Sequence, residues 1–100
     1  MRIKSNHIIA IQKTFLDYFG SDDHLWLFGS RADDAKFGGD IDLYIETQKT
    51  DAEWVMNTRQ KFVSSLRKLI GDQKIDVVIK RPDANLPIYK IAKETGVLLI

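Results

Sequence analysis

The sequence contains no cysteine, and its 100 residues include only two prolines and two histidines. The absence of cysteine excludes a disulfide framework and fits a reducing compartment. Long apolar runs are also missing, so we expect no segment to cross a membrane. Residues 1–15 are too polar and too periodic for a secretory signal. We therefore expect a cytoplasmic protein.

The sequence also has no large excess of positive or of negative charge. Fifteen basic residues stand against fourteen acidic ones, which leaves a formal net charge of +1. Such a balance creates no broad positive field for a phosphodiester backbone, so nucleic acid is not the expected partner. With 44% hydrophobic residues, the chain is long enough for one core. We expect residues 1–100 to form a single domain.

The first expected helix has Ser5 or Asn6 as its N-cap and ends before Gly20. Its apolar side chains recur at helical spacing, at Ile8, Ile11, Phe15, Leu16 and Phe19. The spacing predicts an amphipathic helix.

A second, longer helix is expected between Thr50 and Gly71. Thr50 and Glu53 have the spacing of a capping box. The apolar stripe consists of Val55, Phe62, Leu66 and Leu69. A helix of this length is what a crossover between parallel strands requires, so the strands on either side of it are predicted to be parallel.

The remaining segments alternate between strand and helix patterns. Strands are expected over residues 24–28, 40–46 and 74–80, a short helix over 30–36 and a final helix over 87–95. The last four residues, 97–100, are all apolar and form either a short edge strand or a patch awaiting a partner.

The expected fold class is α/β (α+β), in the order helix, strand, helix, strand, helix, strand, helix. Its mixed sheet has three to four strands. The strands over 24–28 and 40–46 are expected to be antiparallel, because that arrangement brings Ser30 near Asp40.

Three aspartates lie on strands that this arrangement makes neighbours. Asp40 and Asp42 alternate with apolar residues in DIDLYIE, and Asp76 does so in KIDVVIK. Side chains two residues apart share one face of a strand, so the three carboxylates are expected to cluster. Clustered carboxylates resist ionisation unless a cation lies between them. Tyr44 shares this face, and we expect it to pack rather than to stack on a base.

A turn with anion-binding character follows the first strand. Gly29 gives the backbone freedom to approach a ligand, Ser30 offers a hydroxyl, and Arg31 offers a guanidinium. Arg31 either neutralises a phosphate or pairs with Asp33 or Asp34 across the short helix. A cation site beside an anion cradle indicates a metal-bound nucleotide.

These residues suit nucleotidyl transfer. Carboxylates are hard oxygen ligands for Mg2+, and two such ions can stabilise both the attacking and the leaving oxygen. Asp40 and Asp42 would hold both ions. Asp76 would complete the ion nearer the attacking hydroxyl and draw off its proton.

The segment LFGSRADDAKFGGDIDLYIE resembles the signature of the DNA polymerase beta nucleotidyltransferase superfamily, most of all its minimal branch of the antitoxin type. The resemblance implies that Gly29 and Ser30 form the phosphate turn, with Arg31 beside it. It implies that Asp40, Asp42 and Asp76 are the metal ligands and catalytic acids, with ATP as substrate.

The resemblance also implies a partner. Minimal members of this family accompany a helical HEPN-type or substrate-binding protein, and some transfer adenylate to a tyrosine of that protein as antitoxins. After the core elements are assigned, no residues remain to build a pocket for a second substrate. We therefore expect the acceptor hydroxyl to arrive on another protein.

Two alternatives stay open. One is a catalytically inactive interaction module that neutralises its partner by binding. It is motivated by the missing acceptor domain and by the acidic pair Asp33 and Asp34 beside the expected phosphate turn. The other alternative is nucleotidyl transfer to a small molecule or to an RNA end.

Overall fold

A computed structural model describes residues 1–33 and 39–100. The elements in chain order are α1 (Ser5–Tyr18), β1 (His24–Phe28), the short 3-10 helix η1 (Gly29–Ala32), β2 (Ile41–Glu46), α2 (Ala52–Ile70), β3 (Ile75–Lys80), α3 (Pro87–Thr95) and β4 (Val97–Leu98). The expected succession of helices and strands is confirmed. The helix expected over residues 30–36 corresponds to η1, and its residues 34–36 lie outside the described part.

The strands form one mixed sheet in the order β3-β2-β1-β4. β2 and β3 are parallel, whereas β1 is antiparallel to both β2 and β4. These observed directions confirm both strand-direction predictions. α2 supplies the crossover that the parallel strands β2 and β3 need. Residues 97–98 form the edge strand, one of the two alternatives expected for the segment 97–100.

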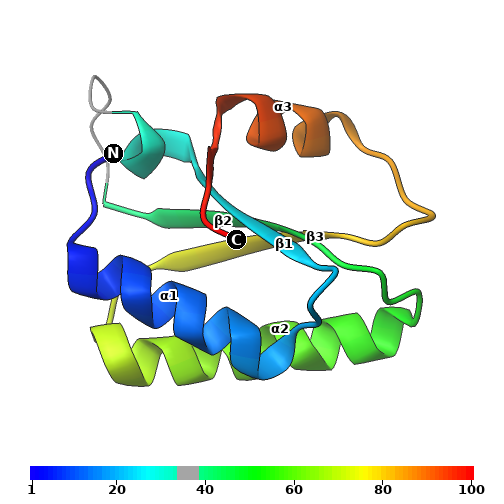
Figure 1. Cartoon of the computed structure of the whole chain (residues 1–100), viewed down its shortest axis with the longest axis horizontal. Helices are drawn as coiled ribbons and strands as arrows, with labels where there is room; N and C mark the ends of the chain where they lie inside the picture. Colours follow the sequence, from blue (N-terminus) through cyan, green and yellow to red (C-terminus); the bar gives the residue numbers. More distant parts are fainter. Residues whose placement is uncertain (34–38) are drawn as a thin grey trace.

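Helices cover both faces of the sheet (Figure 1). α1 and α2 lie side by side on one face, and α3 lies on the other. The main core fills the space between the sheet and the first two helices. It consists of Ile11, Phe15, Phe19, Leu25, Leu27, Ile41, Leu43, Ile45, Phe62, Leu66, Ile70, Ile75 and Val77.

Alternation along the strands divides their side chains between the two faces. Leu43 belongs to the main core, whereas its neighbours Asp42 and Tyr44 point toward the side of α3. The smaller α3-side core contains Trp26, Tyr44, Tyr89 and Ala92. α3 therefore covers only part of its face of the sheet.

The helix caps differ from the sequence prediction. α1 begins after Lys4, which forms no side-chain cap, so the assignment of Ser5 or Asn6 as N-cap was wrong. The N-cap of α2 is Asp51 rather than Thr50, and its carboxylate accepts hydrogen bonds from the backbone N–H groups of Glu53 and Trp54. Aspartate is a strong N-cap, and its charge also complements the helix dipole.

Two leucines of the predicted apolar stripes are in fact exposed. Leu16 is 61% exposed and Leu69 is 58% exposed, while Thr14 and Ile70 are buried beside them. The hydroxyl of Thr14 donates to the carbonyl of Ala10 at 2.7 Å, so its burial leaves no polar group unsatisfied. Hydrophobicity alone therefore assigned Leu16 and Leu69 to the buried stripes in error and omitted Thr14 and Ile70.

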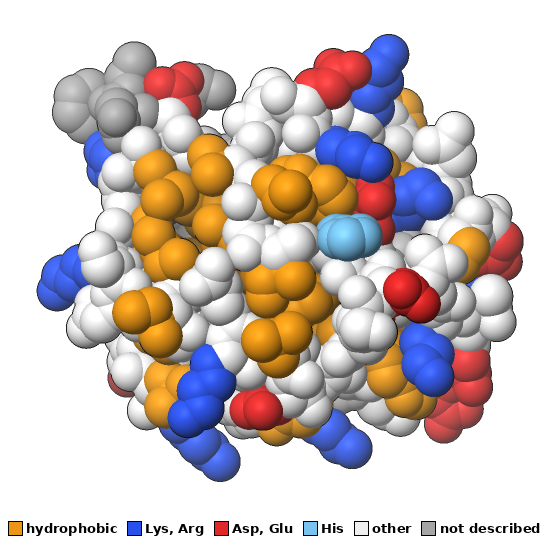
Figure 2. Space-filling view, in the orientation of Figure 1, with side chains coloured by type: hydrophobic (Ala, Val, Ile, Leu, Met, Phe, Trp, Pro, Cys, Tyr) orange, Lys and Arg blue, Asp and Glu red, His pale blue; other side chains and the backbone are white. Residues whose placement is uncertain are grey.

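The described surface mixes apolar and charged side chains. Figure 2 shows hydrophobic groups separated by polar and charged side chains on the face that is nearest the viewer in Figure 1. In residues 1–33 and 39–100, no helix combines the length and the apolar character needed to span a membrane.

Candidate active site

The paired strands β2 and β3 bring two of the predicted acids together. Asp42 lies directly opposite Asp76 in the parallel register, and both side chains point toward the α3 side. Both residues are partly exposed. The prediction that these strands are neighbours is confirmed. Of the three aspartates predicted to share one patch, the register brings together Asp42 and Asp76.

The third acid, Asp40, lies just before β2 and has a cationic neighbour. The Nζ atom of Lys74 is 3.4 Å from Asp40 Oδ2, and both side chains are largely exposed. Lys74 precedes β3, where the backbone N–H of Ile41 donates to the Lys74 carbonyl at 2.9 Å. Lys74 thus balances part of the negative charge of the three aspartates.

Gly29 makes room for the Asp42 carboxylate. Its φ of +73° lies in the left-handed region that side chains rarely adopt. A Cβ atom at this position would overlap Asp42 Oδ2. The register also pairs Phe28 with Asp42, so the turn after β1 passes directly over this carboxylate. Glycine is required here by both conformation and space.

The surroundings raise the pKa of Asp42 above its usual value of 3.8. Desolvation by burial is the largest cause, followed by the negative charges of Asp76 and Asp40, while Lys74 opposes the shift. Lys74 therefore compensates only part of the negative charge around Asp42. Binding of a cation beside Asp42 and Asp76 would relieve the repulsion between them.

The donor chemistry of this site fits Mg2+, but a ready coordination shell is not in place. Carboxylate oxygens are the hard ligands that Mg2+ prefers. Within residues 1–33 and 39–100, no three or more His, Cys, Asp or Glu side chains are grouped closely enough to hold a metal ion. A cation that used Asp40 would have to compete with Lys74 for its carboxylate.

Arg31 contacts the backbone around the acid site. Its guanidinium donates to the carbonyl of Gly39 at 2.9 Å, to the carbonyl of Arg2 at 3.1 Å and to Gln73 Oε1 at 3.4 Å. Arg31 therefore holds the residue that precedes Asp40. The other expectation for Arg31 was a pairing with Asp33 or Asp34. These three acceptors belong to neither residue, and Asp34 lies outside the described part.

Ser30 follows Gly29 in the turn after β1 and is half-buried. Its carbonyl accepts a hydrogen bond from Arg2 Nη2 at 3.3 Å. The segment that precedes α1 is thereby attached to η1, because the backbone N–H of Arg2 also donates to the Arg31 carbonyl at 2.7 Å.

Tyr44 has the packing role that the sequence predicted. It is fully buried, its ring centroid lies 5.2 Å from that of Trp26, and it stacks on Tyr89 at 5.9 Å. Its hydroxyl donates to Glu46 Oε2 at 2.7 Å. Burial, together with this hydrogen bond, raises the pKa of the Tyr44 hydroxyl.

The sequence interpretation missed the contribution of Lys74. Lys74 and Asp76 are two residues apart, so strand alternation alone places them on the same face. This signal could have identified the lysine as a neighbour of the acids. Gln73, which contacts Arg31, carries no comparable signal because its partner is far away in the sequence.

No protein-family model matches the chain, and no curated protein matches its sequence. The resemblance to minimal nucleotidyltransferases therefore depends on the individual residues of the turn and of the acid strands.

Proposed function

We propose that this protein is a Mg2+-dependent nucleotidyltransferase with a minimal nucleotidyltransferase fold. In this proposal it transfers AMP from ATP to a tyrosine hydroxyl of a helical HEPN-type partner, as the cytoplasmic antitoxin of a toxin–antitoxin pair. One observation carries the proposal: Asp42 and Asp76 are register partners on one face of the sheet, and the turn at Gly29 lies against the Asp42 carboxylate.

The proposed division of labour follows from the position of each residue. Asp40, Asp42 and Asp76 would hold Mg2+, which supplies positive charge against the negative charge that develops during phosphoryl transfer. Asp76 would also accept the proton of the attacking hydroxyl. The pKa of Asp42, raised by burial and by its acidic neighbours, supports a need for positive charge at this point.

The turn after β1 would bind the triphosphate. Gly29 lets the backbone approach the phosphates closely, and the Ser30 hydroxyl donates a hydrogen bond to them. Arg31 contributes positive charge beside the turn while its N–H groups hold Gly39 and Arg2. This arrangement orients the phosphates toward the acid pair.

A transfer assay tests the proposal. The protein is incubated with labelled ATP, Mg2+ and the helical protein that copurifies with it from the native cell. We expect the partner to become labelled and to gain the mass of one or more adenylyl groups. The Asp42→Asn variant is expected to lose this transfer, whereas the exposed-acid control Asp83→Asn retains it.

The other outcomes separate the alternatives. Equal labelling by wild type and Asp42→Asn contradicts the catalytic role of the acids. If neither protein labels the partner but both neutralise it, the protein acts as a binding module. Labelled RNA or a labelled small molecule, in the absence of any protein acceptor, identifies a different substrate class.

A further inference from the structure

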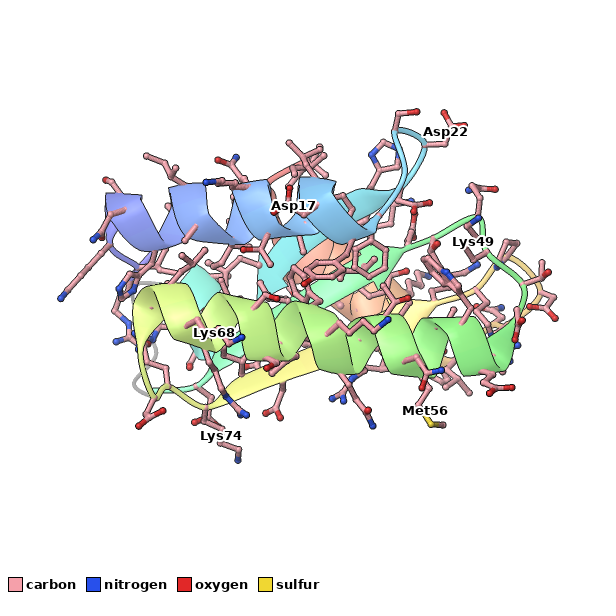
Figure 3. The ribbon with its side chains drawn as sticks, turned by 90° about the horizontal axis from the view of Figure 1, so that it is seen from below. Asp17, Asp22, Lys49, Met56, Lys68 and Lys74 are labelled. Carbon is pink, nitrogen blue, oxygen red and sulfur yellow. The ribbon has the colours of Figure 1, made fainter. Side chains whose placement is uncertain are left out.

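Lys74 lies between the end of α2 and the start of β3, and its ammonium group pairs with Asp40. The side chains of Lys74 and Asp40 are 68% and 46% exposed. Figure 3 shows the Lys74 side chain projecting from the edge of the molecule. Ion pairs with this much exposure to water contribute little to stability, so this pair opens easily.

Arg31, the other basic side chain beside this end of β2, is held more firmly. Its guanidinium donates to the carbonyls of Arg2 and Gly39 and to Gln73 Oε1. Moving it would leave these acceptors without their hydrogen bonds. Within the described residues, the ion-pair partner of Lys74 is Asp40 alone. Lys74, on a flexible stem, is therefore the cation here that can change its partner.

The pairing with Lys74 also bears on how the three aspartates could share a metal ion. Asp42 and Asp76 are register partners, whereas the Asp40 carboxylate is engaged by the ammonium group. A metal ion that takes Asp40 as a ligand brings a second positive charge next to this ammonium, and the two cations repel each other. Metal binding through Asp40 therefore releases Lys74.

The charge of Lys74 reaches the acid pair as well. Burial and the negative charges of Asp76 and Asp40 raise the pKa of Asp42, whereas Lys74 opposes this rise. In the arrangement that the structure shows, the ammonium group thus supplies part of the positive charge that a metal ion would supply. Lys74 and a metal ion are alternatives at the same carboxylate.

A hollow beside Asp40 offers the released ammonium group a second set of acceptors. The hollow has a volume of about 500 Å³. Its basic lining residues are Lys4, His7, Arg31 and Lys74, and its acidic ones are Asp40 and Asp72. Once a metal ion neutralises Asp40, basic groups predominate there and favour phosphate oxygens. Because Arg31 follows Ser30, the hollow adjoins the proposed phosphate turn.

We infer that Lys74 is an exchangeable counterion that couples metal binding to nucleotide binding. Its ammonium group holds Asp40 until a divalent cation takes this carboxylate, and it then pairs with phosphate oxygens of the nucleotide in the hollow. The inference rests on the proposed metal and nucleotide site. Lys74 opposes the binding of metal alone and favours the binding of nucleotide together with metal. A purely structural ion pair would not produce two effects of opposite sign.

Mn2+ titration without nucleotide, followed by the electron paramagnetic resonance signal of free Mn2+, tests the first effect. Lys74→Gln is expected to bind Mn2+ about fivefold more tightly than wild type, because the competing charge is gone. Lys90→Gln is the matched control, since Lys90 Nζ lies 3.8 Å from Glu94 Oε1 in another exposed ion pair. Its Mn2+ affinity should equal that of wild type.

A double-mutant cycle with Asp40→Asn shows whether the competition is for Asp40. In the Asp40→Asn background, Lys74→Gln should change Mn2+ affinity by less than about twofold, because the contested carboxylate is absent. An equal gain in both backgrounds would make Lys74 a general positive charge near the site and would overturn the inference.

Calorimetric titration of a non-hydrolysable ATP analogue at saturating Mg2+ tests the second effect. Lys74→Gln should bind the analogue about fivefold more weakly than wild type, because one charge contact to the phosphates is lost. Lys90→Gln should bind it as wild type does.

The outcomes separate this inference from the proposed function. If wild type binds Mn2+ and the analogue through Asp42, but Lys74→Gln changes neither affinity or changes both in the same direction, the inference is overturned and the proposed function stands. If wild type binds no Mn2+ in a manner that depends on Asp42, the proposed function and the inference both fail.

Discussion

On the α3 side of the sheet, the same strands carry two regions with different roles, an aromatic half and an acid half. In one half, Tyr44 is fully buried between Trp26 and Tyr89. In the other, Asp42 and Asp76 remain partly exposed, and Asp42 lies against the turn at Gly29. Asp42 and Tyr44 are only two residues apart on β2. Whether a residue stabilises the fold or can meet a ligand depends here on whether α3 covers it.

The comparison shows how a small protein separates stability from chemistry. Aromatic burial under α3 contributes favourable free energy. The acid half lowers stability, because burial and like charges raise the pKa of Asp42. Local destabilisation is expected where side chains are arranged for a ligand rather than for each other. The following predictions test this division.

The largest expected effect is on stability in the aromatic half. Tyr44→Ala should lower the free energy of unfolding by about 3–5 kcal/mol, because it leaves a cavity between Trp26 and Tyr89. Urea denaturation measures this loss, with Tyr44→Phe as the milder control that removes only the hydrogen bond to Glu46. A loss below about 1 kcal/mol for Tyr44→Ala would show that the aromatic half is not a core.

The next effect concerns activity in the acid half. Asp42→Asn and Asp76→Asn should each reduce transfer by at least about 100-fold, because each removes a charged ligand from the proposed metal site. Tyr44→Phe should stay within about threefold of wild type, because its ring still packs. Initial rates with labelled ATP measure both. Comparable losses of transfer activity in Tyr44→Phe and Asp42→Asn would contradict the distinction between the aromatic half and the acid half.

A smaller effect is expected where the turn meets the acid site. Gly29→Ala should lower the free energy of unfolding by about 1–3 kcal/mol, because φ is positive and the new Cβ overlaps the Asp42 carboxylate. Gly20→Ala is the control, since its Cβ would lie 3.6 Å from the nearest atom, Asp23 Oδ2. Thermal unfolding of both variants gives the comparison, and equal stabilities would contradict the close approach of turn and carboxylate.

The smallest effect is a pH dependence that arises from Asp42. Its pKa is raised in the folded state, so the folded protein holds this proton more tightly than the unfolded chain. Stability should therefore fall as the pH rises from about 3.8 through the folded pKa. Asp42→Asn removes this fall, so the variant should gain stability relative to wild type between acidic and neutral pH. Urea midpoints at both ends of the range measure the gain, and a constant difference would contradict the raised pKa.

Much of the fold could be predicted because its signals are local or periodic. The length of the helix between the DIDLYIE and KIDVVIK segments indicated the parallel pairing, and strand alternation placed Asp42 and Asp76 on one face. The capping of α2 was misassigned because Thr50 and Asp51 are both good N-caps, and only the backbone decides between adjacent candidates.

Other features depend on contacts between distant residues and leave no pattern in the sequence. Arg31 bonds to the carbonyls of Arg2 and Gly39, and the position of these acceptors is set by the whole fold. Sequence reasoning therefore found the acids but not the contacts that position their surroundings.

Paramagnetic broadening by Mn2+ is the most direct test of the acid site, because this ion takes the same oxygen ligands as Mg2+. In 15N-labelled protein with a non-hydrolysable ATP analogue, the account predicts selective loss of the amide signals of Gly29, Asp42 and Asp76. The loss should be absent in Asp42→Asn and retained in Asp83→Asn. Uniform weak broadening across the protein, or selective broadening that survives in Asp42→Asn, would contradict the account.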